Sequence, residues 1–276
     1  MIHTGKYNTL KINRFSRSGV FLDDGEGNEI LLPQRYVKAD MEPGASVRVF
    51  VYNDSEDRPV AVTDTPAAEA GQLALLSVME IANAGAFLDW GLPKDLLVPF
   101  GEQQERMVKG KSYLVYILVD PVTGRLMGST RLNRYLGKEQ PALEVGEQVE
   151  LVVVRESDIG YHVAVESRFW GILYRNEVFE QLSTGTRLQG FVKLVRPDGK
   201  IDCTLQSGDE NRLQTLADKI LQLLQENEGF LELGDHSSPE EIRTRLKESK
   251  KMFKKAVGLL YRQKKILIET RGLRKT

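Results

Sequence analysis

The sequence is poor in the residues that build disulfides and most metal centres. Its 276 residues include one cysteine, Cys203, and three widely separated histidines, His3, His162 and His236. A single cysteine excludes an internal disulfide framework and a multi-cysteine zinc site. We therefore predict no metal site, no cofactor and a reducing compartment, in which Cys203 is a buried thiol.

Long apolar runs are also missing. No stretch approaches the roughly 18 apolar residues of a membrane helix, and residues 1–15, MIHTGKYNTLKINRF, lack the apolar centre of a secretory signal. We therefore expect a cytoplasmic protein with no part in the membrane.

Catalytic signatures are absent as well. The sequence contains no G-x-x-x-x-G-K-[ST] phosphate loop, no H-E-x-x-H and no G-x-S-x-G. Clustered carboxylates can hold the metal ions of a nuclease, but Asp23 with Asp24, and Asp89 with Asp95, fall on predicted turns. Because solvated turns explain these carboxylates more simply, we predict that the chain is not an enzyme.

What the sequence does have is a repeated spacing of glycine. Gly5, Gly19 and Gly44 are separated by 14 and 25 residues, and the same two gaps recur after shifts of 66 and 75 residues. The second and third copies are Gly71, Gly85 and Gly110, and Gly146, Gly160 and Gly185. Such an internal repeat predicts three copies of one structural unit.

Each copy has the pattern of a small β-barrel. Runs of alternating β-branched and aromatic residues follow the third glycine of each copy, at 47–51, 113–117 and 188–192. Five short strands in so small a unit bury their edges by closing, and we expect the glycines to supply the necessary bends and bulges. We predict tandem five-stranded barrels at 1–64, 67–132 and 143–207, with a hairpin turn at Asp198-Gly199.

The second copy resembles the ribosomal S1-type RNA-binding domain, an OB-fold. Residues 85–99 read GAFLDWGLPKDLLVP, close to the family's Gly-Ala-Phe-Val-Asp run and the Gly-Leu-Val-His segment after it. The resemblance implies that Phe21, Phe87 and His162 stack on bases. The family's histidine position is occupied by Pro33, Pro99 and Tyr174, a departure that weakens the RNA surface of the first two copies. A repeat with a purely structural role is the alternative.

Charge and aromatic content favour the third copy as the RNA-binding one. Phosphate contacts dominate nucleic-acid affinity, yet residues 1–64 carry 8 basic and 10 acidic side chains, 65–140 carry 8 and 8, and 141–208 carry 7 and 10. The third copy still has the best local set of stacking and basic groups. These candidates are Arg155, His162, Arg168, Phe169, Trp170, Tyr174 and Arg175. The alternative for Phe169 and Trp170 is packing between barrels.

Residues 209–276 break the repeat and predict a winged helix. Apolar residues recur at helical spacing over 212–224, which predicts a first helix. Gly229 follows shortly after it, and glycine is typical where a helix ends. Ser238, with Pro239 after it, begins a second helix, and Ser249 begins a third. Residues 265–269 predict a strand that continues into a hairpin near 271–272. The predicted fold is thus mainly β, with three OB-fold barrels and a C-terminal α+β domain.

The overall charge of −1 hides a strongly basic end. From 249 to 276 there are ten basic residues and one acidic residue, Glu269. A basic recognition helix is positioned by phosphates. Its candidate contacts, on the third helix and the wing, are Lys250, Lys251, Lys254, Lys255, Arg262, Lys264, Lys265, Arg271 and Arg274. The third helix lacks a row of Asn, Gln and Arg side chains that could read bases, so we expect little sequence specificity. The alternative is that these basic residues form a solvated face that only caps the repeat array.

The order of these parts resembles the bacterial CvfB/YitL family over essentially the whole chain. The most specific segments are the Ser-Pro-Glu-Glu-Ile run at 238–242 and FKKAVGLLYRQKKI at 253–266. The resemblance implies a cytoplasmic, non-catalytic protein that binds RNA, with single-stranded RNA as its expected partner, and that regulates gene expression after transcription. A DNA-binding transcriptional regulator and a ribosome-associated protein scaffold are the alternatives.

Overall fold

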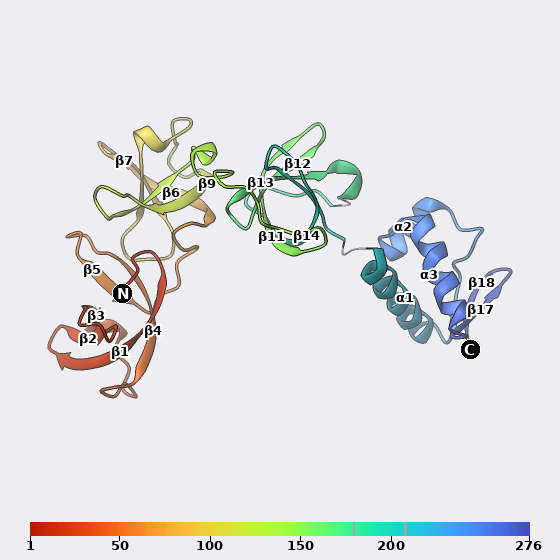
Figure 1. Cartoon of the computed structure of the whole chain (residues 1–276), viewed down its shortest axis with the longest axis horizontal. Coiled ribbons are helices and arrows are strands. Elements are labelled where there is room, and N and C mark those ends of the chain that lie inside the picture. Colours follow the sequence, from red (N-terminus) through yellow and green to blue (C-terminus); the bar gives the residue numbers. More distant parts are fainter. Residues whose placement is uncertain (179, 207–208) are drawn as a thin grey trace.

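The computed structural model of the chain describes residues 1–178, 180–206 and 209–276, and all of their side chains except those of 209–211. Three β-barrels follow one another along the chain, and a mainly helical domain follows the third (Figure 1). The predicted fold class is confirmed.

The first barrel is a closed sheet with the strand order β1-β2-β3-β5-β4. Its strands are β1 (Tyr7–Ser16), β2 (Gly19–Asp23), β3 (Glu29–Pro33), β4 (Ser46–Asn53) and β5 (Pro59–Val62). All neighbours are antiparallel except β3 and β5, which pair in parallel. Closure leaves no free sheet edge, as expected for so small a unit.

The third barrel has the same topology and is also closed. It consists of β11 (Gln148–Ser157), β12 (Gly160–Val165), β13 (Phe169–Tyr174), β14 (Arg187–Val195) and β15 (Ile201–Thr204). The Asp198-Gly199 hairpin joins β14 to β15, where the Arg196 amide donates to the Lys200 carbonyl at 2.8 Å. That prediction is therefore confirmed.

The second barrel closes less completely than the other two. Its strands are β6 (Leu73–Ala82), β7 (Gly85–Asp89), β8 (Leu96–Pro99), β9 (Ser112–Val119) and β10 (Leu126–Ser129). They form a sheet in the order β10-β9-β6-β7-β8, without ladder pairing between β8 and β10. Side chains fill the gap between β8 and β10, because Leu96 and Val98 of β8 pack directly over Gly128 of β10.

The second glycine of each copy allows a close approach between two strands. Gly19, Gly85 and Gly160 have φ values of +140°, +152° and +144° at the start of β2, β7 and β12. A Cβ at any of them would lie well inside 3.0 Å of a carbonyl oxygen on the next strand. Only glycine fits this backbone and this contact, which explains the repeated spacing.

The bulges do not occur at glycine, contrary to our expectation. In each barrel the first strand slips by one residue against the second, between Ile12 and Arg14, between Val78 and Glu80, and again between Val153 and Arg155. A bulge redirects the side chains around it. Here it places the residue after the bulge opposite the predicted base-stacking position.

Neighbouring barrels share buried clusters. Phe50 of β4 and Trp90, which follows β7, meet edge to face with ring centroids 5.9 Å apart, inside one core that spans the first two barrels. A second cluster joins the second and third barrels, with Leu132 and Leu136 packed beside Val152. The barrels are therefore packed against one another through apolar side chains.

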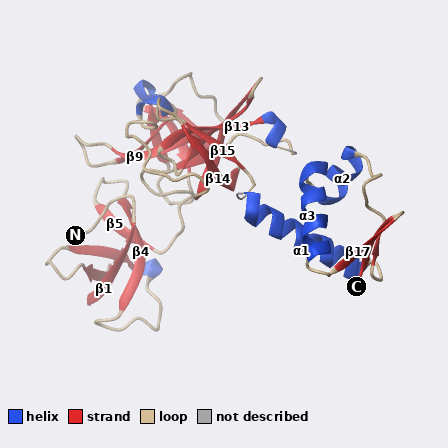
Figure 2. Ribbon diagram, turned by 45° about the vertical axis from the view of Figure 1, so that its right-hand side comes forward, coloured by secondary structure: helices blue, strands red, loops and turns tan. Residues whose placement is uncertain are grey.

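The C-terminal domain has the helices and hairpin that the sequence predicts (Figure 2). Its elements are α1 (Asp209–Glu226), β16 (Phe230–Leu231), α2 (Pro239–Leu246), α3 (Lys250–Arg262), β17 (Ile266–Glu269) and β18 (Gly272–Lys275). The predicted caps form: Ser238 accepts from the Glu241 amide at 3.1 Å and Ser249 from the Met252 amide at 3.2 Å. Strand β16, which extends the hairpin to three strands, was not predicted.

Several smaller predictions have clear outcomes. Cys203 is fully buried, and burial raises the pKa of its thiol to about 12. The carboxylates of Asp23 and Asp89 lie in turns, as predicted, where they accept hydrogen bonds from the backbone amides of Gly25 and Gly91 respectively. Tyr261 of α3 is 53% exposed, although it lies at helical spacing from the buried Val257 and Leu260. No helix among the described residues is long and apolar enough to cross a membrane.

Candidate nucleic-acid interface

The bulge in the first strand of each barrel sets the chemistry of the outer face. In the third barrel it pairs Arg155 of β11 with His162 of β12. The corresponding pairs are Arg14 with Phe21 in the first barrel and Glu80 with Phe87 in the second. An aromatic ring thus meets a cation in the first and third barrels and a carboxylate in the second.

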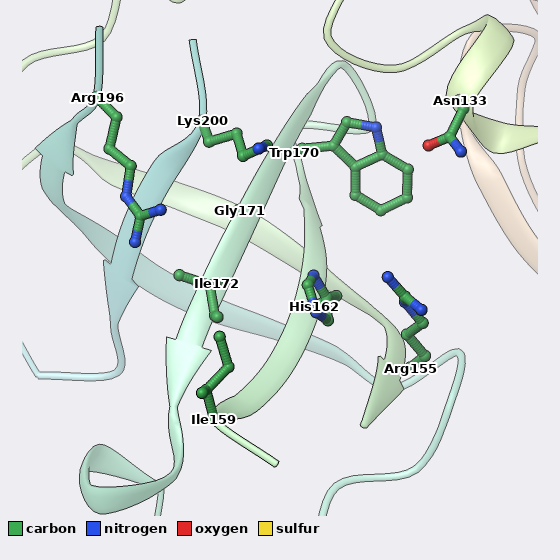
Figure 3. A pocket seen from close by; sticks show the side chains of 9 residues that line it. All are labelled: Asn133, Arg155, Ile159, His162, Trp170, Gly171, Ile172, Arg196 and Lys200. Carbon is green, nitrogen blue, oxygen red and sulfur yellow. The ribbon is translucent and has the colours of Figure 1, made fainter. Parts of the chain in front are cut away.

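The third barrel carries an open cavity of about 360 Å³ on this face (Figure 3). That volume falls in the range of ligand sites, roughly 300–1,000 Å³. Its lining residues are Asn133, Arg155, Ile159, His162, Trp170, Gly171, Ile172, Arg196 and Lys200. The cavity combines aromatic rings, apolar surface and three cations, the composition of a stacking platform with phosphate contacts.

The three cations of the cavity differ in how far they are neutralised. Lys200 pairs with Asp198 at 3.0 Å, and Arg196 pairs with the mostly buried Asp202 at 2.7 Å. Asp202 raises the pKa of Arg196 through this bond. Within the part of the chain that the structure describes, Arg155 has no carboxylate partner. Arg155 therefore contributes the least compensated positive charge in the cavity.

His162 is held in its neutral form at neutral pH. Burial lowers its pKa below the ordinary 6.5, and the nearby charges of Arg155 and Lys200 lower it further. The ring is therefore an uncharged aromatic surface at pH 7, although it lies among cations.

Trp170 lies where the second barrel meets the third. Its side chain packs partly on the cluster shared by the two barrels, and it also lines the cavity. The alternative prediction, packing between barrels, therefore holds for part of the ring. Phe169 is different: it is 4% exposed in the core of the third barrel, which removes it from the candidates.

Three other predicted residues of the third barrel lie outside the cavity lining. Tyr174 reaches it indirectly, because its hydroxyl accepts from Arg196 at 2.5 Å. Arg168 pairs with Glu139. Arg175 donates to the Ser157 carbonyl at 2.8 Å. The two arginines thus stabilise neighbouring loops.

Sequence reasoning missed six lining residues: Asn133, Ile159, Gly171, Ile172, Arg196 and Lys200. Arg196 and Lys200 flank the predicted Asp198-Gly199 hairpin, and the parallel pairing of β13 with β15 brings that hairpin beside Trp170. Asn133 belongs to η3 (Leu132–Arg134), a 3-10 helix after the second barrel. No pattern in the sequence indicates that contact between barrels.

On the outer face of the first barrel, the ring at the predicted stacking position is already covered. The Arg14 guanidinium lies 3.7 Å from the centroid of the Phe21 ring. Arg14 also donates to Glu29 at 2.9 Å and thereby lowers the pKa of that carboxyl group. The predicted stacking residue is therefore covered by an arginine that already has a carboxylate partner.

The face of the second barrel is acidic. Phe87 lines a cavity together with Asp95, whose pKa is raised by burial and by the nearby charges of Asp89 and Glu80. The β4–β5 hairpin of the first barrel reaches the same cavity. There Asp57 pairs with Lys94 at 3.0 Å and with Arg125 at 2.8 Å. The cations of this face are thus already neutralised.

The predicted cations of α3 are not equivalent. Lys250 donates to the carbonyls of Asp235 and Ser237, both at 2.8 Å, and Lys254 pairs with Asp235 at 3.2 Å. Lys251 and Lys255 lie on the exposed side of the helix. Lys250 and Lys254 thus hold the loop at 235–237.

The end of α3 and the wing carry the remaining predicted cations. Arg262 makes a weak bond to the Gly258 carbonyl at 3.3 Å, whereas Arg274 is paired with Glu269 at 2.5 Å. Arg274 also lies 5.1 Å from the centroid of the Phe230 ring, so it is largely engaged. Lys264, Lys265 and Arg271 are exposed around the hairpin.

Comparison with known families agrees with this architecture. Residues 4–64 match the S1 domain, and residues 218–274 match the CvfB-like winged helix domain. These two domain types support binding to nucleic acid as the general activity.

Two relatives match this chain over nearly the whole length of both proteins. The chain is 28% identical to the YitL protein of Bacillus subtilis (strain 168), over 96% of this chain and 91% of that protein. It is 26% identical to Conserved virulence factor B of Staphylococcus aureus (strain N315), over 96% and 92% of the two chains. The chain also matches a crystal structure of a multidomain protein with nucleic acid binding domains from Streptococcus pneumoniae TIGR4. That match covers 99% of this chain and 98% of the other, at 23% identity and a TM-score of 0.41. The predicted resemblance to the CvfB/YitL family is confirmed.

Proposed function

We propose that this chain, as a CvfB/YitL-type protein, is a non-catalytic RNA-binding regulator of gene expression that acts after transcription in the cytoplasm. It binds single-stranded RNA through the third barrel and the winged helix, with low overall sequence specificity. The first two barrels, at 1–64 and 67–132, serve as a scaffold that makes little contact with RNA.

One observation carries this proposal: the cavity of the third barrel combines stacking rings with uncompensated positive charge. Trp170 and neutral His162 offer aromatic faces, on which a base gains about 1–3 kcal/mol. Arg155, which has no carboxylate partner among the described residues, lies beside them as the main candidate phosphate contact. Lys200 lies there too, and its exposed pairing with Asp198 is open to exchange for a phosphate. The equivalent faces of the other barrels are covered by Arg14 or are acidic.

The winged helix adds a sequence-independent contribution. Lys251, Lys255 and the wing residues Lys264, Lys265 and Arg271 present exposed positive charge. Long flexible lysines contact phosphates as point charges. Two linked sites on one strand raise the apparent affinity above that of either site.

The test is a titration of the full chain with a labelled single-stranded RNA of mixed sequence, at low and near-physiological salt. Arg155→Ala with Lys200→Ala should weaken binding about tenfold or more and flatten the salt dependence, because each lost phosphate contact lowers the slope. Arg168→Ala is the matched control, because it removes an exposed arginine of the same barrel outside the cavity.

Matched duplex DNA separates the alternatives. Tighter binding to duplex DNA than to RNA, unaffected by the cavity substitutions, would favour a DNA-binding regulator. No binding to either nucleic acid would leave a protein scaffold. RNA binding that survives the double substitution would contradict the proposed site.

A further inference from the structure

The cavity of the third barrel has one wall that the third barrel does not supply. Asn133 comes from η3 of the second barrel, and Figure 3 shows its amide pointing toward the indole of Trp170. We propose that Asn133 reads the edge of a base stacked on Trp170, which gives this cavity a preference for adenine. The inference rests on the proposed RNA binding and adds base selectivity at one nucleotide.

Asn133 is presented by a rigid element. On one side of it, Arg134 pairs with Glu102 at 2.6 Å, and the Tyr135 hydroxyl donates to the same carboxylate at 3.0 Å. Leu132 precedes it and is buried in the cluster shared by the second and third barrels. A side chain on a fixed backbone loses less entropy when it binds.

Trp170 is fixed as well. Its backbone pairs with Ala164 in the β12–β13 ladder, and the Gly137 amide donates to the neighbouring Arg168 carbonyl at 2.7 Å. A Cβ at Gly137 would lie 3.2 Å from Cδ1 of the indole, so the segment after η3 contacts this edge of the ring. Both barrels therefore determine where Trp170 lies relative to Asn133.

The chemistry of the lining selects the base. The cavity's Arg155, Arg196 and Lys200 side chains can only donate hydrogen bonds, whereas neutral His162 has one acceptor nitrogen. The amide oxygen of Asn133 provides a further acceptor, beside the Trp170 ring, for an exocyclic amino group. The amide nitrogen supplies a donor beside it. This donor–acceptor pair matches an amino group next to a ring nitrogen, which adenine offers on two of its edges and cytosine on one. A purine also covers more of the indole than a pyrimidine does.

The test uses the full chain and four uridine-rich oligoribonucleotides of one length that differ only in the central base: A, C, G or U. Binding is followed by fluorescence anisotropy. We expect the A oligonucleotide to bind at least about fivefold tighter than the U oligonucleotide. Asn133→Ala should weaken binding of the A oligonucleotide and so reduce the A-to-U ratio, while the U affinity stays unchanged. The better stacking of a purine on Trp170 keeps A above U in this variant.

The controls separate this inference from the proposed function. Asn176→Ala removes another exposed asparagine in a 3-10 helix, η4 (Arg175–Glu177) of the third barrel, and should preserve the preference. An unchanged A-to-U ratio in Asn133→Ala would overturn the inference while RNA binding stands, as would tightest binding to the G oligonucleotide. No binding of any oligonucleotide by the unaltered chain would overturn the proposed function itself.

Discussion

One position of the repeat determines the charge on the outer face of each barrel. After the bulge stands Arg14 in the first barrel, Glu80 in the second and Arg155 in the third. Arg14 is paired with Glu29, whereas Arg155 has no carboxylate partner among the described residues. The first strand of every barrel carries the same bulge, so this one side chain contributes to the different chemistry of the three faces.

The first prediction concerns the titration of His162. Burial, Arg155 and Lys200 all lower its pKa, so the folded state favours the neutral ring. The associated stabilisation is present above the ordinary value of 6.5 and is lost as the pH falls through the lowered pKa. An NMR titration of the imidazole should show a midpoint below 6.5, and Arg155→Gln should raise that midpoint. An unchanged midpoint in Arg155→Gln would show that the two side chains do not interact.

The second prediction concerns the glycine at the start of β7. In Gly85→Ala the new methyl group meets the Val98 carbonyl, and the residue must keep a φ of +152°. We expect the free energy of unfolding to fall by at least about 1–3 kcal/mol, measured by chemical denaturation. Gly101→Ala is the control, because nothing lies within 4 Å of its Cβ position. Equal effects of both substitutions would argue against the close approach.

Single residues also show what the sequence could predict. The glycine spacing predicted the barrels because the positive φ at Gly19, Gly85 and Gly160 is a property of the local backbone that favours glycine. The positions of the bulges were not predicted, because they follow from pairing between strands. Asn133 and Lys200 were missed as site residues for the same reason: their positions depend on packing between distant parts of the chain.

Among the elements, the β4–β5 hairpin links the first two barrels. It carries Asp57, which pairs with Lys94 and Arg125 of the second barrel, and it lies next to the core that both barrels share. The ion pairs are partly exposed and contribute little. The shared apolar core therefore provides most of the coupling.

The third prediction follows from that shared core. Phe50→Ala removes a fully buried ring that packs on Trp90 of the second barrel, and we expect a loss of about 3–5 kcal/mol. Hydrogen exchange should show weaker protection in β6–β10 as well as in β1–β5. Weaker protection confined to the first barrel would mean that the two barrels open independently.

The helices were predicted more accurately than the surfaces they form. Caps at Ser238 and Ser249 are local signals and appear as expected. The exposure of Tyr261 and the engagement of Lys250 and Lys254 by the 235–237 loop depend on tertiary contacts. Helical periodicity locates a face but not the loops that cover it.

In the whole molecule, positive charge is concentrated at the C-terminal end. Residues 249–276 carry ten basic side chains and one acidic one, whereas residues 1–64 and 141–208 are each net acidic. Because opposite charges nearly cancel over the chain, long-range attraction of RNA depends on this basic end and on the cavity of the third barrel.

The fourth prediction concerns this division of charge. Lys251→Glu with Lys255→Glu should weaken RNA binding for every sequence alike, about tenfold at low salt and less at high salt. The adenine preference should be unchanged, because the cavity is not altered. Lys109→Glu with Lys111→Glu, on exposed positions of the second barrel, is the control. If both pairs of substitutions weaken binding equally, the winged helix has no special role and the effect reflects net charge.

The most direct test of the account is photocrosslinking of the full chain to single-stranded RNA, followed by mass spectrometry of the linked peptides. Crosslinks should fall on Trp170 and His162 and on the β14–β15 hairpin with Lys200, which all border one cavity, and on α3 or the wing. Crosslinks concentrated on Phe21 or Phe87, with none in the third barrel, would contradict the assignment of RNA binding to the third barrel.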